Sequence, residues 1–256
     1  LPNPAGTMYY NTTHVQAGAR IFGRTLQNPG SRLTHIGLSE NKIGREGIEA
    51  LCVGLKKNET LTTLDLKRNG ISFAAGALLA DMLAHNTSLL WIDLSWNGLA
   101  GQGSVPIFKC LGKGIPESPD LGSSSDDGFH LRRNTTLRSI NLSWCGLGNK
   151  SLAIAKSVVD CLHVNSSLTD IALSHNQLSE PACVSIVGAL ANHASMRALH
   201  LNGNDPSPML SFQAVEQCSE LGPGDHLPSH RLPCRSLQRA LKRCALVRPS
   251  QSKLTA

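Results

Sequence analysis

Aromatic residues are scarce in this chain of 256 residues, at 4% of the composition, so its core has to be built from aliphatic side chains. The three Trp residues therefore stand out individually. No apolar stretch is long enough to cross a membrane, because the best candidate, residues 71–83, is interrupted by Gly76 and Asp81. The start of the chain carries no recognisable secretory signal. We therefore expect a protein that neither enters a membrane nor is secreted.

Acidic residues are absent from His226 to the end of the sequence, whereas seven basic residues lie there. The formal net charge of +6 and the pI of about 9.0 therefore arise in this tail. In the rest of the chain, 17 basic and 18 acidic residues nearly cancel. A nucleic-acid partner, which such a pI would otherwise favour, is not expected for the body of the protein.

The eight cysteines include no CxxC pair. Four of them occupy apolar helical or strand-edge patterns, namely Cys52, Cys110, Cys161 and Cys183. This placement predicts reduced, buried core residues in an intracellular protein.

The prominent positive feature is an internal repeat, the pattern LxxLxLxxNxL. Copies of this pattern begin at Leu33, Leu61, Leu89, Leu137, Leu168 and Met196. The alternating apolar residues place aliphatic side chains on one face of a short strand. The Asn after the strand is suited to bond backbone groups of the turn, in register with its neighbours, and Cys145 replaces it once. The remainder of a unit has helical spacing, as in residues 46–58.

A 28-residue unit with a full helix and an Asn-x-Ser/Thr before the next Leu resembles the ribonuclease-inhibitor subfamily of leucine-rich repeats. The resemblance covers about residues 18–204 and implies an α/β solenoid. This is a horseshoe with parallel strands on the concave face and helices on the convex face. The segment before Leu33 resembles the helix of an earlier repeat, so we expect the chain to be part of a longer protein. The repeat is shared by proteins of many functions, so it predicts the fold alone.

We expect three regions: an N-terminal extension at 1–17, the repeat array at 18–205, and a C-terminal region at 206–256. An insertion near 112–130 is expected to enter the fourth strand from its N-terminal edge. Four glycosylation-like sequences occupy one repeat position, at Asn58, Asn86, Asn134 and Asn165. We attribute them to the repeat consensus and not to glycosylation.

Strand positions three, five, seven and eight of each unit, counted from its first apolar residue, are expected to point into the concavity. All three Trp residues fall on them. Trp96 and Trp144 share position eight in successive units, so they are expected to be neighbours, with Trp91 nearby. Because Trp and Arg are typical of interaction hot spots, we predict a partner-binding site made of Trp91, Trp96, Trp144, Arg68, Asp65, Asp93 and His175. Ordinary packing of each Trp on its neighbour is the alternative.

The C-terminal region combines a Pro-rich linker with a basic amphipathic helix at 236–247. This helix is expected to cap the solenoid. The alternative is that it forms a second candidate site, which would bind a partner through Arg239, Lys242 and Arg243. A zinc site can also be drawn here, but its spacing matches no motif that we recognise, so no metal is expected. The residues concerned are Cys218, His226, His230 and Cys234.

No GxSxG, HExxH, Walker A or GxGxxG motif is present, so we predict a protein without catalytic residues, cofactor or small-molecule substrate. The prediction is a non-enzymatic protein–protein interaction module or scaffold subunit. Its expected setting is an intracellular, cytoplasmic assembly, with a cytoskeletal or ciliary one considered. One alternative is the sensor domain of a nucleotide-binding immune receptor. A second is a GTPase activator of the Ran type using Arg68, and a third is nucleic-acid sensing through the tail.

Overall fold

The computed structural model describes residues 12–116, 131–148, 152–190 and 193–204. Most of the insertion and the whole region 206–256 lie outside these residues. The second candidate site (Arg239, Lys242 and Arg243) and the possible zinc site both belong to 206–256, so they also lie outside the described residues. The domain bounds drawn from the sequence therefore stay a prediction.

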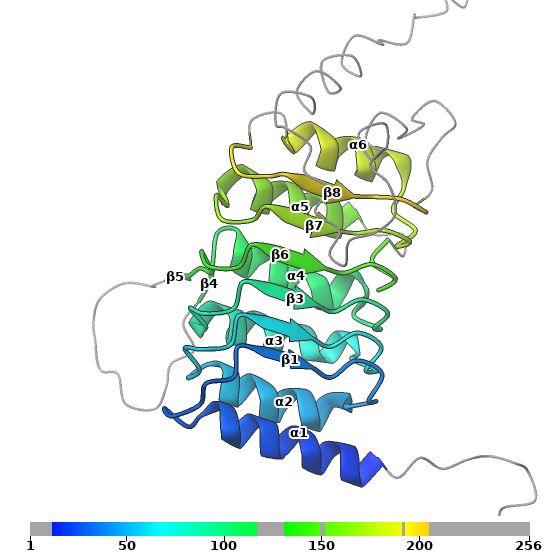
Figure 1. The fold of residues 1–256 in the computed structure, drawn as a ribbon. Helices are drawn as coiled ribbons and strands as arrows, with labels where there is room; N and C mark the ends of the chain where they lie inside the picture. Colours follow the sequence, from blue (N-terminus) through cyan, green and yellow to red (C-terminus); the bar gives the residue numbers. More distant parts are fainter. Residues whose placement is uncertain (1–11, 117–130, 149–151, 191–192, 205–256) are drawn as a thin grey trace, which may run out of the picture.

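A parallel sheet forms one side of the molecule, with the strand order β1-β2-β3-β6-β7-β8 (Figure 1). Its strands are β1 (His35–Gly37), β2 (Thr63–Asp65), β3 (Trp91–Asp93), β6 (Ser139–Asn141), β7 (Asp170–Ala172) and β8 (Ala198–His200). Every strand consists of positions three to five of its unit, and each position pairs with the same position of the next unit. The register derived from the repeat is therefore confirmed.

Helices pack on the opposite side of the sheet (Figure 1). They are α1 (Thr12–Leu26), α2 (Gly44–Leu55), the short 3₁₀ helix η1 (Phe73–Ala75), α3 (Gly76–His85), α4 (Ala100–Leu111), α5 (Leu152–Val164) and α6 (Glu180–Ala189). The arrangement confirms the predicted α/β solenoid, in which a strand and a helix alternate along the stack.

The core between the sheet and the helices is aliphatic, as the scarcity of aromatic residues predicts. Phe108 is completely buried and belongs to a core made mostly of Leu and Ile. The five described cysteines are buried and form no disulfide, and burial raises the pKa of the Cys52 thiol to about 12. These thiols are core residues and poor nucleophiles.

The Asn that ends the strand motif forms a hydrogen-bonded ladder through the turns. Asn97 Oδ1 accepts hydrogen bonds from the backbone N–H groups of Asn69 (2.9 Å) and Ile71 (3.0 Å), and its Nδ2 donates to the Leu66 carbonyl (3.0 Å). Cys145 keeps part of this role, because its Sγ donates to the carbonyl oxygen of Leu94 (3.1 Å). The predicted role of the Asn in the turn is confirmed.

The Asn residues of the glycosylation-like sequences form a second ladder at the other edge of the sheet. Asn86 is 2% exposed, its Oδ1 accepts from the Leu89 N–H (2.7 Å), and its Nδ2 donates to the Leu55 carbonyl (2.7 Å). Asn134 repeats this pattern. A glycan would have to be attached to the buried, hydrogen-bonded Nδ2, so the attribution to the repeat consensus is confirmed. In the last unit, His193 Nδ1 accepts from the Met196 N–H (3.1 Å) in place of the Asn.

Two features were not expected from the sequence. The insertion is closed at its base by a short antiparallel pair, β4 (Ile115–Pro116) with β5 (Leu131–Arg132). Figure 1 places this pair at the edge where the strands of the large sheet begin, as the sequence predicts for the base of the insertion.

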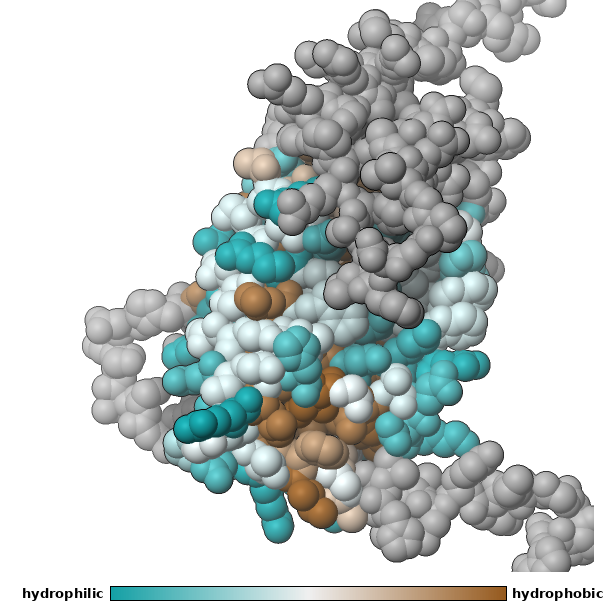
Figure 2. All heavy atoms as spheres, viewed as in Figure 1, coloured by the Kyte–Doolittle hydropathy of each residue, from teal (hydrophilic) through white to brown (hydrophobic). Residues whose placement is uncertain are grey.

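The second feature lies at the α1–β1 end of the stack. Apolar side chains gather on the surface there (Figure 2), where Ile21, Phe22 and Leu33 are exposed.

Candidate functional site

The residues at position eight line the edge where the strands of the sheet end, and we call them the position-eight ladder. Its members are Glu40, Arg68, Trp96, Trp144 and His175. Their backbones all lie in the left-handed region, with φ between 54° and 63°, a conformation that costs about 1–2 kcal/mol for a residue with a side chain. Backbone hydrogen bonds fix it: the Trp96 N–H donates to the Ser143 carbonyl (2.9 Å) and the Trp144 N–H to the Ser174 carbonyl (3.0 Å).

The side chains of the ladder form one continuous stack. The rings of Trp96 and Trp144 lie 4.4 Å apart at 15°, and those of Trp144 and His175 lie 4.2 Å apart at 13°. On the other side of Trp96, the Arg68 Cζ atom lies 5.2 Å from the ring centroid. Arg68 Nη1 in turn donates to Glu40 Oε1 at 3.1 Å. The 4.7–4.9 Å spacing of neighbouring strands brings rings at one repeat position to stacking distance.

The stack ends at Gly203, which is position eight of the last unit. A Cβ atom on Gly203 would lie 2.0 Å from Nδ1 of His175, and its φ of +68° also favours glycine. The imidazole of His175 therefore lies against the backbone of the following turn. Both ends of the aromatic stack are thus covered, one by a guanidinium and one by backbone.

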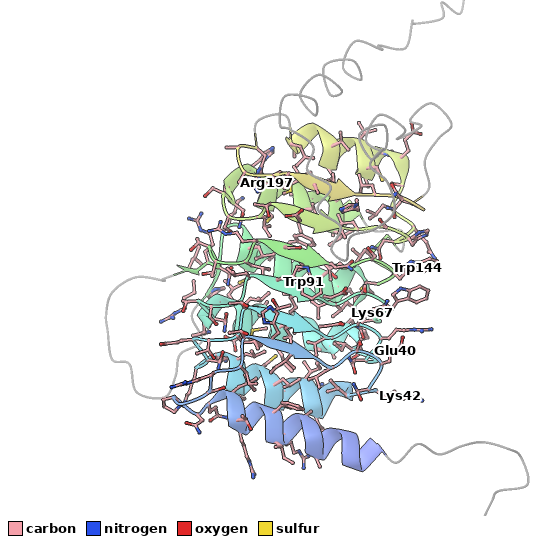
Figure 3. The ribbon with its side chains drawn as sticks, in the orientation of Figure 1. Glu40, Lys42, Lys67, Trp91, Trp144 and Arg197 are labelled. Atoms are coloured by element: carbon pink, nitrogen blue, oxygen red, sulfur yellow. The ribbon has the colours of Figure 1, made fainter. Side chains whose placement is uncertain are left out.

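The two Trp side chains of the ladder stay open to solvent in spite of this stacking. Trp96 is 43% exposed and Trp144 is 44% exposed. Their stacked faces are covered by neighbouring rings, so the surface that they offer consists mainly of ring edges. Figure 3 shows Trp144 projecting at the edge of the sheet, together with Glu40 and Lys67.

Trp91 occupies a different place from the other two Trp residues. It lies at position three of β3, between Thr63 and Ser139, on the face of the sheet and partly buried. Within the described residues its ring stacks on neither Trp96 nor Trp144. Figure 3 shows Trp91 over the middle of the sheet and Trp144 at its margin. The structure thus brings Arg68, Trp96, Trp144 and His175 together and separates Trp91 from them.

Asp65 and Asp93 shape the turns that lead to the ladder. Asp65 Oδ1 accepts from the Lys67 N–H (2.9 Å), and Asp93 Oδ1 accepts from the Ser95 N–H (2.7 Å). Asp93 is 8% exposed, and its second oxygen accepts from Asn141 Nδ2 at 2.9 Å. Asp93 therefore supports the turn from within, whereas Asp65 is partly exposed and holds the next turn through one carboxylate oxygen.

Sequence reasoning missed the continuous stack and its dependence on left-handed backbone. One signal was available: a Gly at position eight of the last unit, where the other units carry large side chains, indicates a position that tolerates positive φ. Lys67, at position seven of the second unit, was not among the predicted site residues but precedes Arg68 of the ladder directly. Its side chain forms no ion pair with any other described residue.

The ladder presents aromatic rings, a guanidinium group and a carboxylate at the surface. In the described part of the chain, no group of three or more His, Cys, Asp or Glu residues is placed to hold a metal ion. None of the described helices combines the length and apolarity that a membrane crossing requires. The described side chains supply aromatic edges, cations and hydroxyl groups along one margin of a rigid sheet.

Residues 33–52, 57–77 and 133–153 match a family model described as Leucine Rich repeat. The chain is 28% identical over 187 residues to the Mus musculus NACHT, LRR and PYD domains-containing protein 12, and the aligned region is 68% of this chain and 17% of that protein. It is 27% identical over 175 residues to the Sus scrofa ribonuclease inhibitor, and the aligned region is 68% of this chain and 33% of that protein. A solved Caenorhabditis elegans tropomodulin C-terminal domain matches the fold with a TM-score of 0.49 at 12% identity. The match spans 70% of this chain and 91% of the tropomodulin chain.

Proposed function

We propose that this chain, which is a leucine-rich-repeat protein of the ribonuclease-inhibitor type, is a non-enzymatic module that binds a protein partner along its position-eight ladder. The observation that carries the proposal is the exposure of two stacked Trp side chains, Trp96 and Trp144, at more than 40% each. Trp is enriched at the energetic centres of protein interfaces. Covering the exposed part of each ring contributes about 2 kcal/mol of apolar burial.

The rigidity of the ladder also supports binding. Its side chains are stacked and its turns are held by backbone hydrogen bonds. Little side-chain freedom is therefore lost when a partner docks, and this entropy would otherwise weaken the complex.

An intracellular setting is part of the proposal. The five described cysteines lie in the core and form no disulfide, as is usual where the cell keeps thiols reduced. The buried Asn side chains of the glycosylation-like sequences fit the same setting. In this proposal the chain serves as a scaffold subunit of an intracellular assembly.

The proposal is tested by affinity capture from cell extract, followed by mass spectrometry. The chain is compared with a Trp96→Ala, Trp144→Ala double variant and with a control, Phe73→Ala with Val184→Ala, which removes exposed apolar side chains from η1 and α6. Circular dichroism verifies the fold of each. We expect a specific partner to be recovered by the parent and the control and lost by the Trp variant. Equal recovery by all three proteins would refute binding at the ladder.

A second candidate function is favoured by the similarity to NACHT, LRR and PYD domains-containing proteins over 68% of the chain. In this case the chain is the repeat region of a longer protein whose other domains bind nucleotide. Immunoprecipitation of the cellular protein with an antibody to this chain, with peptide mapping, distinguishes the two functions. Peptides from a nucleotide-binding domain in the same polypeptide favour the receptor, and their absence from a fully mapped polypeptide favours the scaffold subunit.

No observation favours a GTPase activator that uses Arg68. Such an Arg has to reach a bound nucleotide, whereas the guanidinium group of Arg68 lies over the ring of Trp96.

A further inference from the structure

The edge of the sheet that carries the position-eight ladder has a mainly basic part and an aromatic part. The basic part lies in the turns of the first two units and contains Lys42, Lys67 and Arg68 beside Glu40, and the aromatic part lies in the next three units and contains Trp96, Trp144 and His175. The boundary lies between β2 and β3, where Arg68 covers one face of Trp96. Figure 3 shows Lys42, Glu40, Lys67 and Trp144 along this one edge.

Positive charge in the basic part is only partly neutralised. Glu40 pairs with Arg68, but both side chains are more than half exposed, at 60% and 54%. Such surface ion pairs are weak and exchange readily. Asp65 directs one oxygen to the backbone N–H of Lys67. The Lys67 ammonium group itself is paired with no described carboxylate, so an incoming carboxylate gains an ion pair there without displacing one.

The aromatic part complements this charge. Because the ring faces are stacked on each other, a partner meets mainly ring edges, which carry partial positive charge. A cation gains little here, since the open faces that attract cations are occupied by Arg68 and the neighbouring rings. Apolar or aromatic side chains and oxygen acceptors fit this surface.

We propose that the position-eight ladder binds an acidic, extended protein segment that places carboxylates on Lys67 and Arg68 and an apolar or aromatic side chain on Trp96 and Trp144. This inference rests on the proposed function and specifies the chemistry of the partner. Three strand spacings separate β2 from β7, a span of about 14 Å, which an extended chain crosses in about four residues. The acidic and apolar side chains therefore belong to one short linear segment.

The probe is a phage-displayed random 12-residue peptide library selected on the parent chain, after depletion on the Trp96→Ala, Trp144→Ala variant. Enriched sequences are synthesised with a fluorescent label, and binding is measured by fluorescence anisotropy. We expect enrichment of at least two acidic residues within about four residues of an aromatic one. The affinity is expected to fall about tenfold or more with Lys67→Glu, and to fall with added salt.

Lys57→Glu is the matched control, because it makes the same charge change at an exposed position in the connection between α2 and β2. It is expected to leave the affinity within about twofold of the parent value. Enriched peptides without acidic residues, equal effects of the Lys67 and Lys57 changes, or no ladder-dependent peptide would each overturn the inference. If the captured protein partner nevertheless requires Trp96 and Trp144, only this inference fails. If it does not require them, the proposed function fails as well.

Discussion

Replacing Trp144 measures what the ladder contributes to the stability of the fold. Trp144 is the central rung, with one ring contact to Trp96 and one to His175. Aromatic pairs of this kind contribute about 0.5–1.5 kcal/mol each. Trp144→Ala is therefore expected to lower the free energy of unfolding by about 1–3 kcal/mol.

Trp144→Gly separates the stacking from the backbone strain. Both variants lose the same two ring contacts, but glycine relieves the left-handed conformation, where Trp144 has a φ of 58°. Part of this relief is offset by the greater freedom of glycine in the unfolded chain. We expect the Gly variant to be more stable than the Ala variant by about 0.5–1 kcal/mol.

Urea unfolding followed by circular dichroism supplies both values, with the slope m compared among variants to confirm the same transition. A double-mutant cycle between Trp96→Ala and Trp144→Ala is expected to give a coupling energy of about 0.5–1.5 kcal/mol. The cycle between Trp91→Ala and Trp144→Ala serves as control and is expected to be additive within about 0.5 kcal/mol. Equal stability of the Ala and Gly variants, or equal coupling in both cycles, would refute the stacked ladder.

Four further predictions concern other parts of the fold. Gly76→Ala is expected to lower the free energy of unfolding by more than about 2 kcal/mol, because the added Cβ would lie 2.0 Å from the Gly103 carbonyl oxygen. Gly188→Ala is the control and should leave the stability unchanged or raise it, because its Cβ would meet nothing within 4 Å. Burial lowers the pKa of His193 below 6.5, so the unfolded chain binds this proton at a higher pH than the folded protein does. The free energy of unfolding should therefore fall as the pH drops below 6.5 towards the lowered pKa, and His193→Asn should remove this part of the pH dependence. Asn97→Ala leaves two backbone N–H groups and the Leu66 carbonyl without this partner and should cost about 2–4 kcal/mol, whereas no loss would contradict the ladder of turns. At pH 8 the five described thiols, including Cys110 with a pKa raised by burial to about 11, should react with a thiol reagent far more slowly in the native protein than in urea. Peptide mapping assigns the labelled sites, and rapid native labelling of these five would be the contrary result.

The repeat pattern was sufficient to predict the register of the sheet. Each LxxLxLxxNxL unit has one way to bury its Leu side chains while its Asn bonds the neighbouring turn. Strands therefore appear at positions three to five in every unit. The same logic identified Asn86 and its equivalents as structural, because local spacing fixes hydrogen bonds of this kind.

Particular side chains of the candidate site were less predictable. Asp93 was assigned to the site as a concave-face residue, yet it is buried and bonds to Ser95 and Asn141. Trp91 lies on the face of the sheet, whereas Trp96 and Trp144 stack at the edge where the strands end. In both cases the outcome depends on neighbours from units 28 or more residues away.

The sequence by itself determined the repeat, its strand register and the aliphatic core, because these follow from periodic contacts that each unit repeats. It also determined that Trp96 and Trp144 occupy equivalent positions. Only the tertiary structure decided that Arg68, Trp96, Trp144 and His175 form one continuous stack. The physical reason is that these side chains stack only when neighbouring strands lie at stacking distance and all five turns hold their position-eight residue in the left-handed conformation. Both conditions are met only once the units have packed against each other.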